Sequence, residues 1–156
     1  MTINSKYFTL EELISSPTAR RLGINNNPSA HIVAALQLLV TNVLDPLREE
    51  WGAPIIVTSG YRSPKVNAAT PGASKTSQHM QGEAADIRTV SDSREDNMKL
   101  LRCLLQSGIE FDQVICEYPD ANGRPDWIHV SYTTRRANRR VKTTCRGGKY
   151  YSGIKL

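Results

Sequence analysis

Apolar residues recur every three or four positions between residues 32 and 47, which is the spacing of one face of an α-helix. Asn27 and Pro28 precede this run. We therefore expect the helix to begin there, with Asn27 as its cap and Pro28 in its first turn. Pro46 lies inside the pattern and should kink the helix or separate its last turn. Gly52 should end the helix.

Three shorter segments also have helical signals. Thr9–Glu12 has the pattern of a capping box, which predicts a short helix after it. Ser63 and Pro64 predict a small helix with a serine cap and a proline in its first turn. Residues 92–106 have leucine and methionine at helical spacing, and Gly108 should end that helix.

Short apolar runs predict four strands, over residues 54–58, 84–88, 113–118 and 127–132. A polar loop containing Asn122 and Gly123 should join the last two strands, and the small residues of 68–78 indicate another loop. Helices come first along the chain, and strands interleaved with helices follow. This order predicts an α+β fold, with a small, mainly antiparallel sheet packed against helices. We expect residues 1–156 to form a single domain.

Composition narrows the class of protein. The chain has 156 residues, of which 39% are hydrophobic and 22% charged, enough for one packed core. No apolar stretch reaches about 18 residues, so we predict no membrane span. Residues 1–10 lack the pattern of a secretion signal, and we expect synthesis in the cytoplasm. Three distant cysteines do not form a zinc-ribbon or disulfide pattern. We expect a monomer.

The chain is basic, with a formal net charge of +5. This charge favours an anionic partner, either nucleic acid or a bacterial wall rich in phosphate and carboxylate. Much of it lies in the C-terminal tail, residues 135–156, which we interpret as a solvated segment; contact with an anionic polymer is the alternative. Because no nucleic-acid motif or stacking aromatic residue lies among the basic residues, nucleic acid is unlikely as a partner.

Three residues have the chemistry of a metal site. A catalytic zinc ion typically takes three protein ligands from histidine and carboxylate and keeps one position open for water. His79, Asp86 and His129 supply such a set. Small residues between His79 and Asp86 allow a tight turn that could bring the two together. Asp86 lies in an apolar run, where a carboxylate is costly unless a metal or hydrogen bonds compensate it.

Asp126 is a candidate for proton transfer. It lies three residues before His129, and positions three apart on a regular strand face opposite sides. Asp126 must therefore lie in the loop before the strand, which Pro125 favours. From there it could act as general base on metal-bound water and then protonate the leaving amine. Taken singly, a structural histidine or a turn-capping aspartate is the commoner explanation, but together these residues form a complete site.

These residues resemble the M15 peptidase family, which includes zinc D-Ala-D-Ala carboxypeptidases, D-Ala-D-Ala dipeptidases and phage L-alanyl-D-glutamate endopeptidases. The family pattern S-x-H-x-x-G-x-A-x-D matches residues 77–86, and an acidic residue, two others and a histidine match residues 126–129. Residues 59–63 resemble the S-G-Y-R-S segment that precedes the zinc motif. The resemblance runs from about Val57 to Tyr132.

The resemblance implies a hedgehog/DD-peptidase-like fold and one zinc ion bound by His79, Asp86 and His129. It implies that Asp126 is the catalytic acid–base. Arg62 would polarise the scissile carbonyl or hold a substrate carboxylate, since a fixed guanidinium group stabilises negative charge. A purely structural arginine is the alternative for Arg62.

Two further residues would belong to the substrate pocket. Ser77 would support the first histidine or the substrate, and a loop cap is the alternative. Glu117 would be a pocket residue, although an edge carboxylate explains it as well.

The function implied by the resemblance is zinc-dependent hydrolysis of peptidoglycan stem peptides. Many carboxypeptidase and dipeptidase members have glutamate where this chain has Asp126, and small phage-associated members often have aspartate. We therefore expect an endolysin-like enzyme encoded by a phage or prophage, which reaches the bacterial cell wall after release or lysis. The alternative is an inactive, zinc-containing module that binds wall peptides. Arg62 and Asp126 argue against this alternative, because a binding module needs no catalytic base.

Overall fold

The computed structural model describes all 156 residues. Six strands and six α-helices follow one another, with a π-helical turn (η1) and a 3-10 turn (η2): α1 (Leu10–Ile14), α2 (Pro17–Leu22), α3 (Ala30–Leu39), η1 (Val40–Leu44), α4 (Asp45–Trp51), β1 (Ile55–Ser59), α5 (Pro64–Ala68), η2 (Gln78–Gln81), β2 (Ala84–Thr89), α6 (Arg94–Gln106), β3 (Gln113–Glu117), β4 (Trp127–Ser131), β5 (Val141–Arg146) and β6 (Lys149–Ser152). This arrangement confirms the predicted α+β class.

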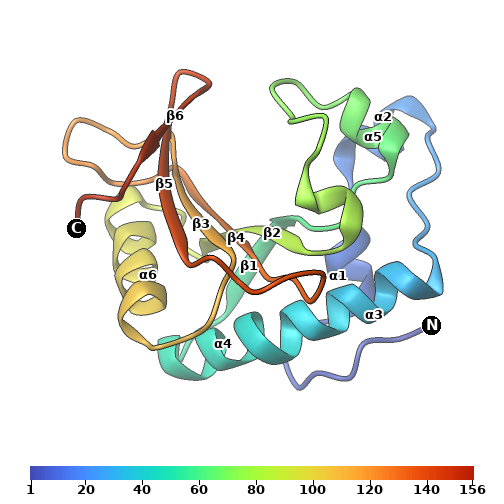
Figure 1. Ribbon diagram of the computed structural model, residues 1–156, viewed down its shortest axis with the longest axis horizontal. Helices are drawn as coiled ribbons and strands as arrows, with labels where there is room; N and C mark the ends of the chain where they lie inside the picture. Colours follow the sequence, from blue (N-terminus) through green and yellow to red (C-terminus); the bar gives the residue numbers. More distant parts are fainter.

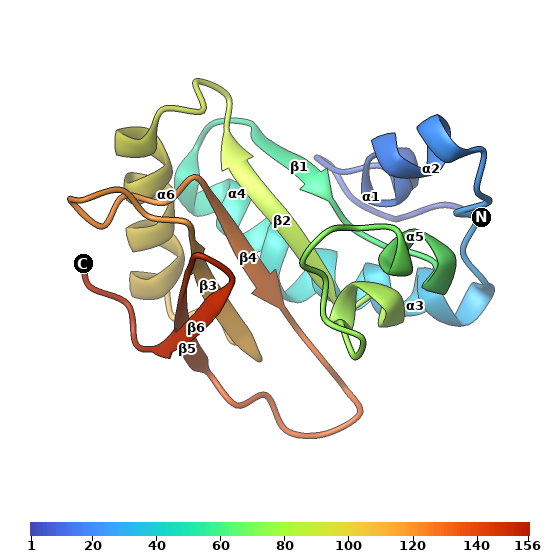
Figure 2. The ribbon, with the colours of Figure 1, turned by 90° about the horizontal axis from the view of Figure 1, so that it is seen from above.

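The strands form one sheet in the order β1-β2-β4-β3-β5-β6. Neighbouring strands are antiparallel except for β3 and β5, which are parallel. The helices α3, α4 and α6 lie along one side of the sheet (Figure 1). Figure 2 shows the opposite side, where the segment containing α5 and η2 faces the β5–β6 hairpin across β2 and β4.

The hydrophobic core lies between the sheet and these helices. It is one cluster of 25 buried residues, from Phe8 near the N-terminus to Val130 in β4. Leu36, Leu101 and Ile128 have no exposed surface. Full burial of one such side chain contributes about 1.5–3 kcal/mol, so this cluster holds the sheet firmly against the helices. The other side of the sheet is free to carry polar side chains.

The long helical segment begins later than the sequence predicted. The first helical residue is Ala30, and the cap is Ser29 rather than Asn27. The Ser29 hydroxyl accepts a hydrogen bond from the Ile32 backbone N–H at 3.3 Å. Pro28 therefore lies before the helix, because serine offers the side-chain oxygen that the free N–H groups need.

Pro46 is accommodated by a change of helix type. The π-helical turn η1 lies directly before α4, and Pro46 lies in the first turn of α4, so the chain continues as far as Trp51. Pro46 has no N–H and cannot donate the backbone hydrogen bond of an α-helix. The wider π-helical turn lies directly before it, so Pro46 falls in the first turn of α4, where that donor is not needed. Gly52 ends α4 in the left-handed conformation, as predicted.

The continuous helical run Ala30–Trp51 is the one segment long and apolar enough to cross a membrane, judged by length and composition alone. Its apolar face packs into the core described above, with Leu36, Leu39 and Leu47 fully buried. The core helix of a protein can have the same length and composition.

Two regions differ from the sequence prediction. The helix α2 was not predicted, although Ser16 caps it as Ser63 caps α5. Residues 141–152 form β5 and β6, and the prediction of a solvated C-terminal tail was wrong for the buried residues 143–145 of β5, whereas β6 is exposed. The strand β5 pairs with β3, so its order depends on a partner far away in sequence.

Candidate metal centre

Strand register brings two of the predicted ligands together. Asp86 in β2 lies directly opposite His129 in β4. Side chains alternate along a strand, so the neighbours Ile87 and Ile128 point into the core while Asp86 and His129 point to the opposite side. The polar pair is thus fixed by the same alternation that builds the core.

The third ligand comes from η2, the turn just before β2. Ser77 caps this turn, and its hydroxyl accepts a hydrogen bond from the His79 backbone N–H at 3.2 Å. Gly82 ends the turn with φ +69°, and a Cβ atom there would lie 2.8 Å from the Ile32 carbonyl oxygen. Glycine is therefore required at this position. The turn returns the chain to β2 within a few residues, which places His79 beside Asp86.

A hydrogen bond to the backbone carbonyl of Gly60 orients the ring of His79. Nδ1 of His79 lies 2.7 Å from the Gly60 carbonyl oxygen, and since a carbonyl can only accept, Nδ1 carries the proton. The lone pair of Nε2 then faces Asp86. A Cβ atom on Gly60 would lie 2.1 Å from the Leu13 carbonyl oxygen, so only glycine fits where the chain supports the ring.

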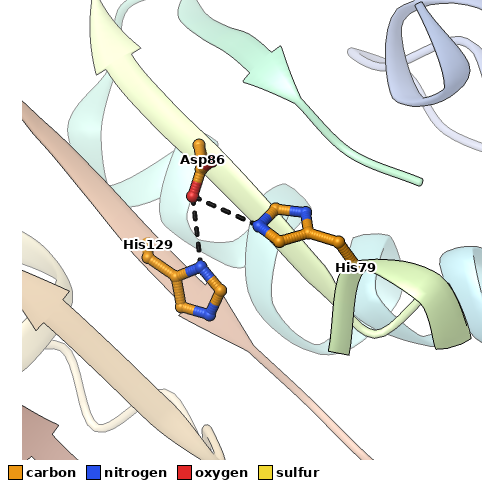
Figure 3. A group of neighbouring side chains, drawn as sticks. All are labelled: His79, Asp86 and His129. Carbon is orange, nitrogen blue, oxygen red and sulfur yellow. Dashed lines mark hydrogen bonds and ion pairs between the residues drawn. The ribbon is translucent and has the colours of Figure 1, made fainter. Parts of the chain in front are cut away.

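The three side chains converge as a metal site requires (Figure 3). His79 Nε2 lies 3.4 Å from Asp86 Oδ1, and His129 Nδ1 lies 3.1 Å from the same oxygen. One donor atom from each residue falls within 4.8 Å of the others, and all three residues are buried. Donors at about 2.1 Å from a tetrahedral zinc ion lie roughly 3.4 Å apart, so this set fits a zinc ion.

The electrostatics of the group favour an ionised Asp86 and a neutral His79. Burial alone would raise the pKa of Asp86, but the adjacent imidazoles of His79 and His129, including a hydrogen bond with His129, hold it below its usual range. Burial lowers the pKa of His79, which outweighs the opposing attraction of Asp86. A carboxylate and a neutral imidazole are the forms that bind a metal ion.

Arg62 lies next to the metal ligands and is fixed on three sides. Its Nε donates to the Ser59 hydroxyl at 3.1 Å, Nη1 to Asn67 Oδ1 at 3.3 Å, and Nη2 to Asp86 Oδ2 at 3.4 Å. The Arg62 backbone N–H also donates to the His79 carbonyl oxygen. The guanidinium group is therefore a preorganised positive charge beside Asp86.

The three ligands and Arg62 line a cavity of about 660 Å³. The loop of residues 70–78 borders the cavity, and Ser77 and Glu117 lie in its wall. Ser77 thus both caps η2 and reaches the cavity. Glu117 is buried, and that burial, reinforced by the negative charge of Asp86, raises its pKa to about 7.

Asp126 lies in the loop directly before β4, as predicted from the sequence. Its backbone N–H donates to the Glu117 carbonyl oxygen, and its own carbonyl accepts from Asn97. The Asp126 side chain is exposed, and Asp126 is not among the residues that line the cavity. The structure therefore brings Glu117 to the cavity but not the carboxylate of Asp126.

A family model described as peptidase M15 matches residues 6–131. This match covers most of the chain. The chain belongs to the peptidase M15 family. Among curated proteins, no sequence matches it significantly. Members of the M15 family are metallopeptidases, which agrees with the His79–Asp86–His129 group and its fit to a metal ion.

Part of the cavity wall of this M15 peptidase was not predicted from the sequence. Three arginines of the predicted tail, Arg135, Arg136 and Arg139, lie in its wall, as do Tyr118 and Tyr150. The arginines are basic residues in a segment without hydrophobic periodicity, so no local pattern places them. The signal that could have found them is the pair of acidic residues that they bind, Glu83 and Asp112.

Proposed function

We propose that this M15 peptidase is a zinc-dependent enzyme that hydrolyses the stem peptides of peptidoglycan. The observation that carries the proposal is the group of His79, Asp86 and His129, which converge on one point in a cavity large enough for a peptide. A carboxypeptidase that trims a D-Ala-D-Ala end and an endopeptidase that cuts an L-Ala-D-Glu bond both fit this geometry.

In this proposal His79, Asp86 and His129 hold the ion, and Gly60 fixes the tautomer of His79. A zinc ion held there would polarise a carbonyl group and lower the pKa of water towards neutrality. Arg62 stabilises negative charge that develops on the scissile carbonyl oxygen, or holds a substrate carboxylate, because its guanidinium group is already fixed at the site.

Peptide hydrolysis also needs a group that takes a proton from water and passes it to the leaving amine. The resemblance assigns this role to Asp126. The cavity favours Glu117, which is buried in the cavity wall and stays protonated more readily than an ordinary glutamate. We propose Glu117 for the role, with Asp126 as the alternative.

A pair of isosteric variants separates these carboxylates. Glu117→Gln should lower kcat about 10³-fold, in the range typical of a lost general base, while the bound metal stays at one equivalent. Asp126→Asn should keep turnover within about threefold of wild type. If Asp126→Asn instead abolishes turnover and Glu117→Gln does not, the assignment reverses in favour of the family pattern.

The substrate is tested by digesting purified peptidoglycan and identifying the products by mass spectrometry. Released stem fragments or free D-alanine, absent from a metal-free sample, are expected, and their masses name the bond. Zinc binding together with peptide binding but no product would instead identify a wall-binding module.

We further infer that the enzyme is made in the cytoplasm by a phage or prophage and reaches the wall on release or lysis. The aspartate at position 126, typical of small phage-associated members, supports this. Addition of the purified protein to intact and to permeabilised bacteria tests it, and lysis of the permeabilised cells alone is the expected result.

A further inference from the structure

The cavity has two chemically different ends with the metal ligands between them. Strand pairing places Trp127 opposite Glu117 at one end of the cavity and His129 opposite Ile115 in the middle. Gln113, the first residue of β3, lines the cavity towards the other end. Tyr118 and Tyr150 join Trp127 at the first end, and the Tyr118 and Trp127 rings lie 5.3 Å apart. The segment after β4 supplies the second end.

That second end is cationic. Arg135, Arg136 and Arg139 all line the cavity. Arg135 pairs with the buried carboxylate of Glu83, and Arg136 and Arg139 share the buried carboxylate of Asp112. Three guanidinium groups are thus held by two carboxylates, which leaves one formal positive charge at this end.

The three guanidinium groups still have donors to offer. Arg135 and Arg139 each bond through Nε and Nη2, and Arg136 through its two Nη atoms. Arg135 Nη1, Arg139 Nη1 and Arg136 Nε make no hydrogen bond within the chain. Between 41% and 53% of each side chain is exposed. Arg62 differs, because all three of its nitrogens are engaged.

We propose that Arg135, Arg136 and Arg139 form an anion subsite that binds a free carboxylate of the substrate and so sets its direction across the metal centre. Their buried carboxylate partners fix the guanidinium planes in advance, and fixed guanidinium groups are suited to forked recognition of a carboxylate. The aromatic end then takes the less charged part of the substrate. The inference rests on the proposed function for the identity of the ligand, since stem peptides carry several free carboxylates.

The test compares a synthetic stem peptide with analogues in which each free carboxylate is converted in turn to a carboxamide. For wild type, one of these changes should raise KM about tenfold and leave kcat within about twofold, because the metal ligands are untouched. Arg136→Gln and Arg139→Gln, made separately, should raise KM for the parent peptide similarly. They should leave KM for the sensitive amide analogue unchanged.

Single variants protect the fold, because Asp112 keeps one arginine when the other is replaced. Arg136→Lys and Arg139→Lys keep the charge and should recover part of the selectivity. The matched control is Arg102→Gln, on the exposed surface of α6, which should behave as wild type with every peptide. Equal losses on the parent peptide and its amide would overturn the subsite, as would a wild type indifferent to every amidation.

Failure of the proposed function has a different signature. If zinc-loaded protein cuts no peptide, the same peptides are compared by isothermal titration calorimetry. Tighter binding of the free carboxylate, lost in Arg136→Gln, would support the subsite without the enzyme. Equal affinity for the peptide and all of its amides would overturn the subsite as well.

Discussion

Two segments that line the same cavity become ordered in different ways. Residues 77–86 begin and end on local signals, the Ser77 cap and the left-handed Gly82, although distant residues such as Gly60 also support the segment. Residues 133–152 depend on distant partners: Arg135 pairs with Glu83, 52 residues away, and Arg136 pairs with Asp112, 24 residues away. Local chemistry can be read from a sequence, whereas long-range pairing has to be found in the fold.

Removal of a ligand from the first segment should have the largest effect. His79→Ala should lower hydrolysis on the order of a thousandfold and abolish zinc binding, since a bound metal ion contributes several kcal/mol to catalysis. Metal analysis and product release measure both. His31→Ala is the matched control, because His31 lies exposed in α3, and it should keep wild-type values. A zinc-replete, active His79→Ala protein would exclude His79 as a ligand.

A change at Gly60, which supports the His79 ring, should lower the stability of the fold as well as zinc binding. In Gly60→Ala the new Cβ atom would lie 2.1 Å from the Leu13 carbonyl oxygen, so the backbone has to move. We expect a loss of about 3 kcal/mol in the free energy of unfolding, measured in urea. Zinc affinity should fall too, because Gly60 supports the His79 ring. Gly60 does not have a left-handed backbone, so its loss reports the clash with Leu13 alone. Gly108→Ala, at φ +77° with nothing within 4 Å of the new Cβ atom, should cost only left-handed strain of about 1–2 kcal/mol and leave zinc affinity unchanged.

Replacement of Asp112, the buried carboxylate that binds Arg136 and Arg139 of the second segment, should have a smaller effect on stability, and this effect should depend on pH. Burial would raise the pKa of Asp112, but hydrogen bonds from Arg139 and Arg136 hold it well below its usual range. Asp112→Asn should therefore lower the free energy of unfolding by about 2 kcal/mol at pH 7. Asp112 contributes its stability above the unfolded pKa, near 3.9, and loses it as the pH falls further.

Urea unfolding at pH 7, 5 and 3 checks this sign. The gap between wild type and Asp112→Asn should persist at pH 5 and shrink at pH 3. If the difference in free energy of unfolding grew as the pH fell, Asp112 would not be ionised in the folded protein. Asp92→Asn, an exposed carboxylate, should leave the free energy of unfolding within about 0.5 kcal/mol of wild type.

The smallest effect is expected at Arg140, which directly precedes β5 in the second segment. The Arg140 guanidinium group lies 5.0 Å from the centre of the Phe111 ring and donates to the Ile109 carbonyl oxygen. Because Arg140 itself is exposed, Arg140→Gln should lower the free energy of unfolding by about 0.5–1 kcal/mol. Thermal unfolding measures it, and hydrolysis should not change. A loss of activity would show that the segment acts as one unit.

The elements that the sequence predicted correctly carry local or repeated signals. The periodicity of the long helix, the strand alternation around Asp86 and His129, and the Ser63 cap all depend on residues within one turn or one strand. The convergence of His79, Asp86 and His129 was expected from residue chemistry together with the resemblance. The structure brings these three together.

The remainder depended on contacts that no local pattern encodes. The strands β5 and β6 join the sheet only through the parallel pairing of β5 with β3. The exposure of Asp126 depends on where the loop before β4 turns, and the position of Glu117 depends on the register of β3 with β4. A cap at Ser29 instead of Asn27 is a choice between two suitable residues close together.

The most direct test of the account is a zinc titration of metal-free protein, with release of stem fragments from purified peptidoglycan as the readout. The expected result is hydrolysis that rises in proportion to added zinc and levels off at one equivalent per chain, with no response from His79→Ala. Failure of the metal-free protein to take up zinc, or hydrolysis that does not depend on added metal, would contradict the central claim that His79, Asp86 and His129 form a catalytic metal centre.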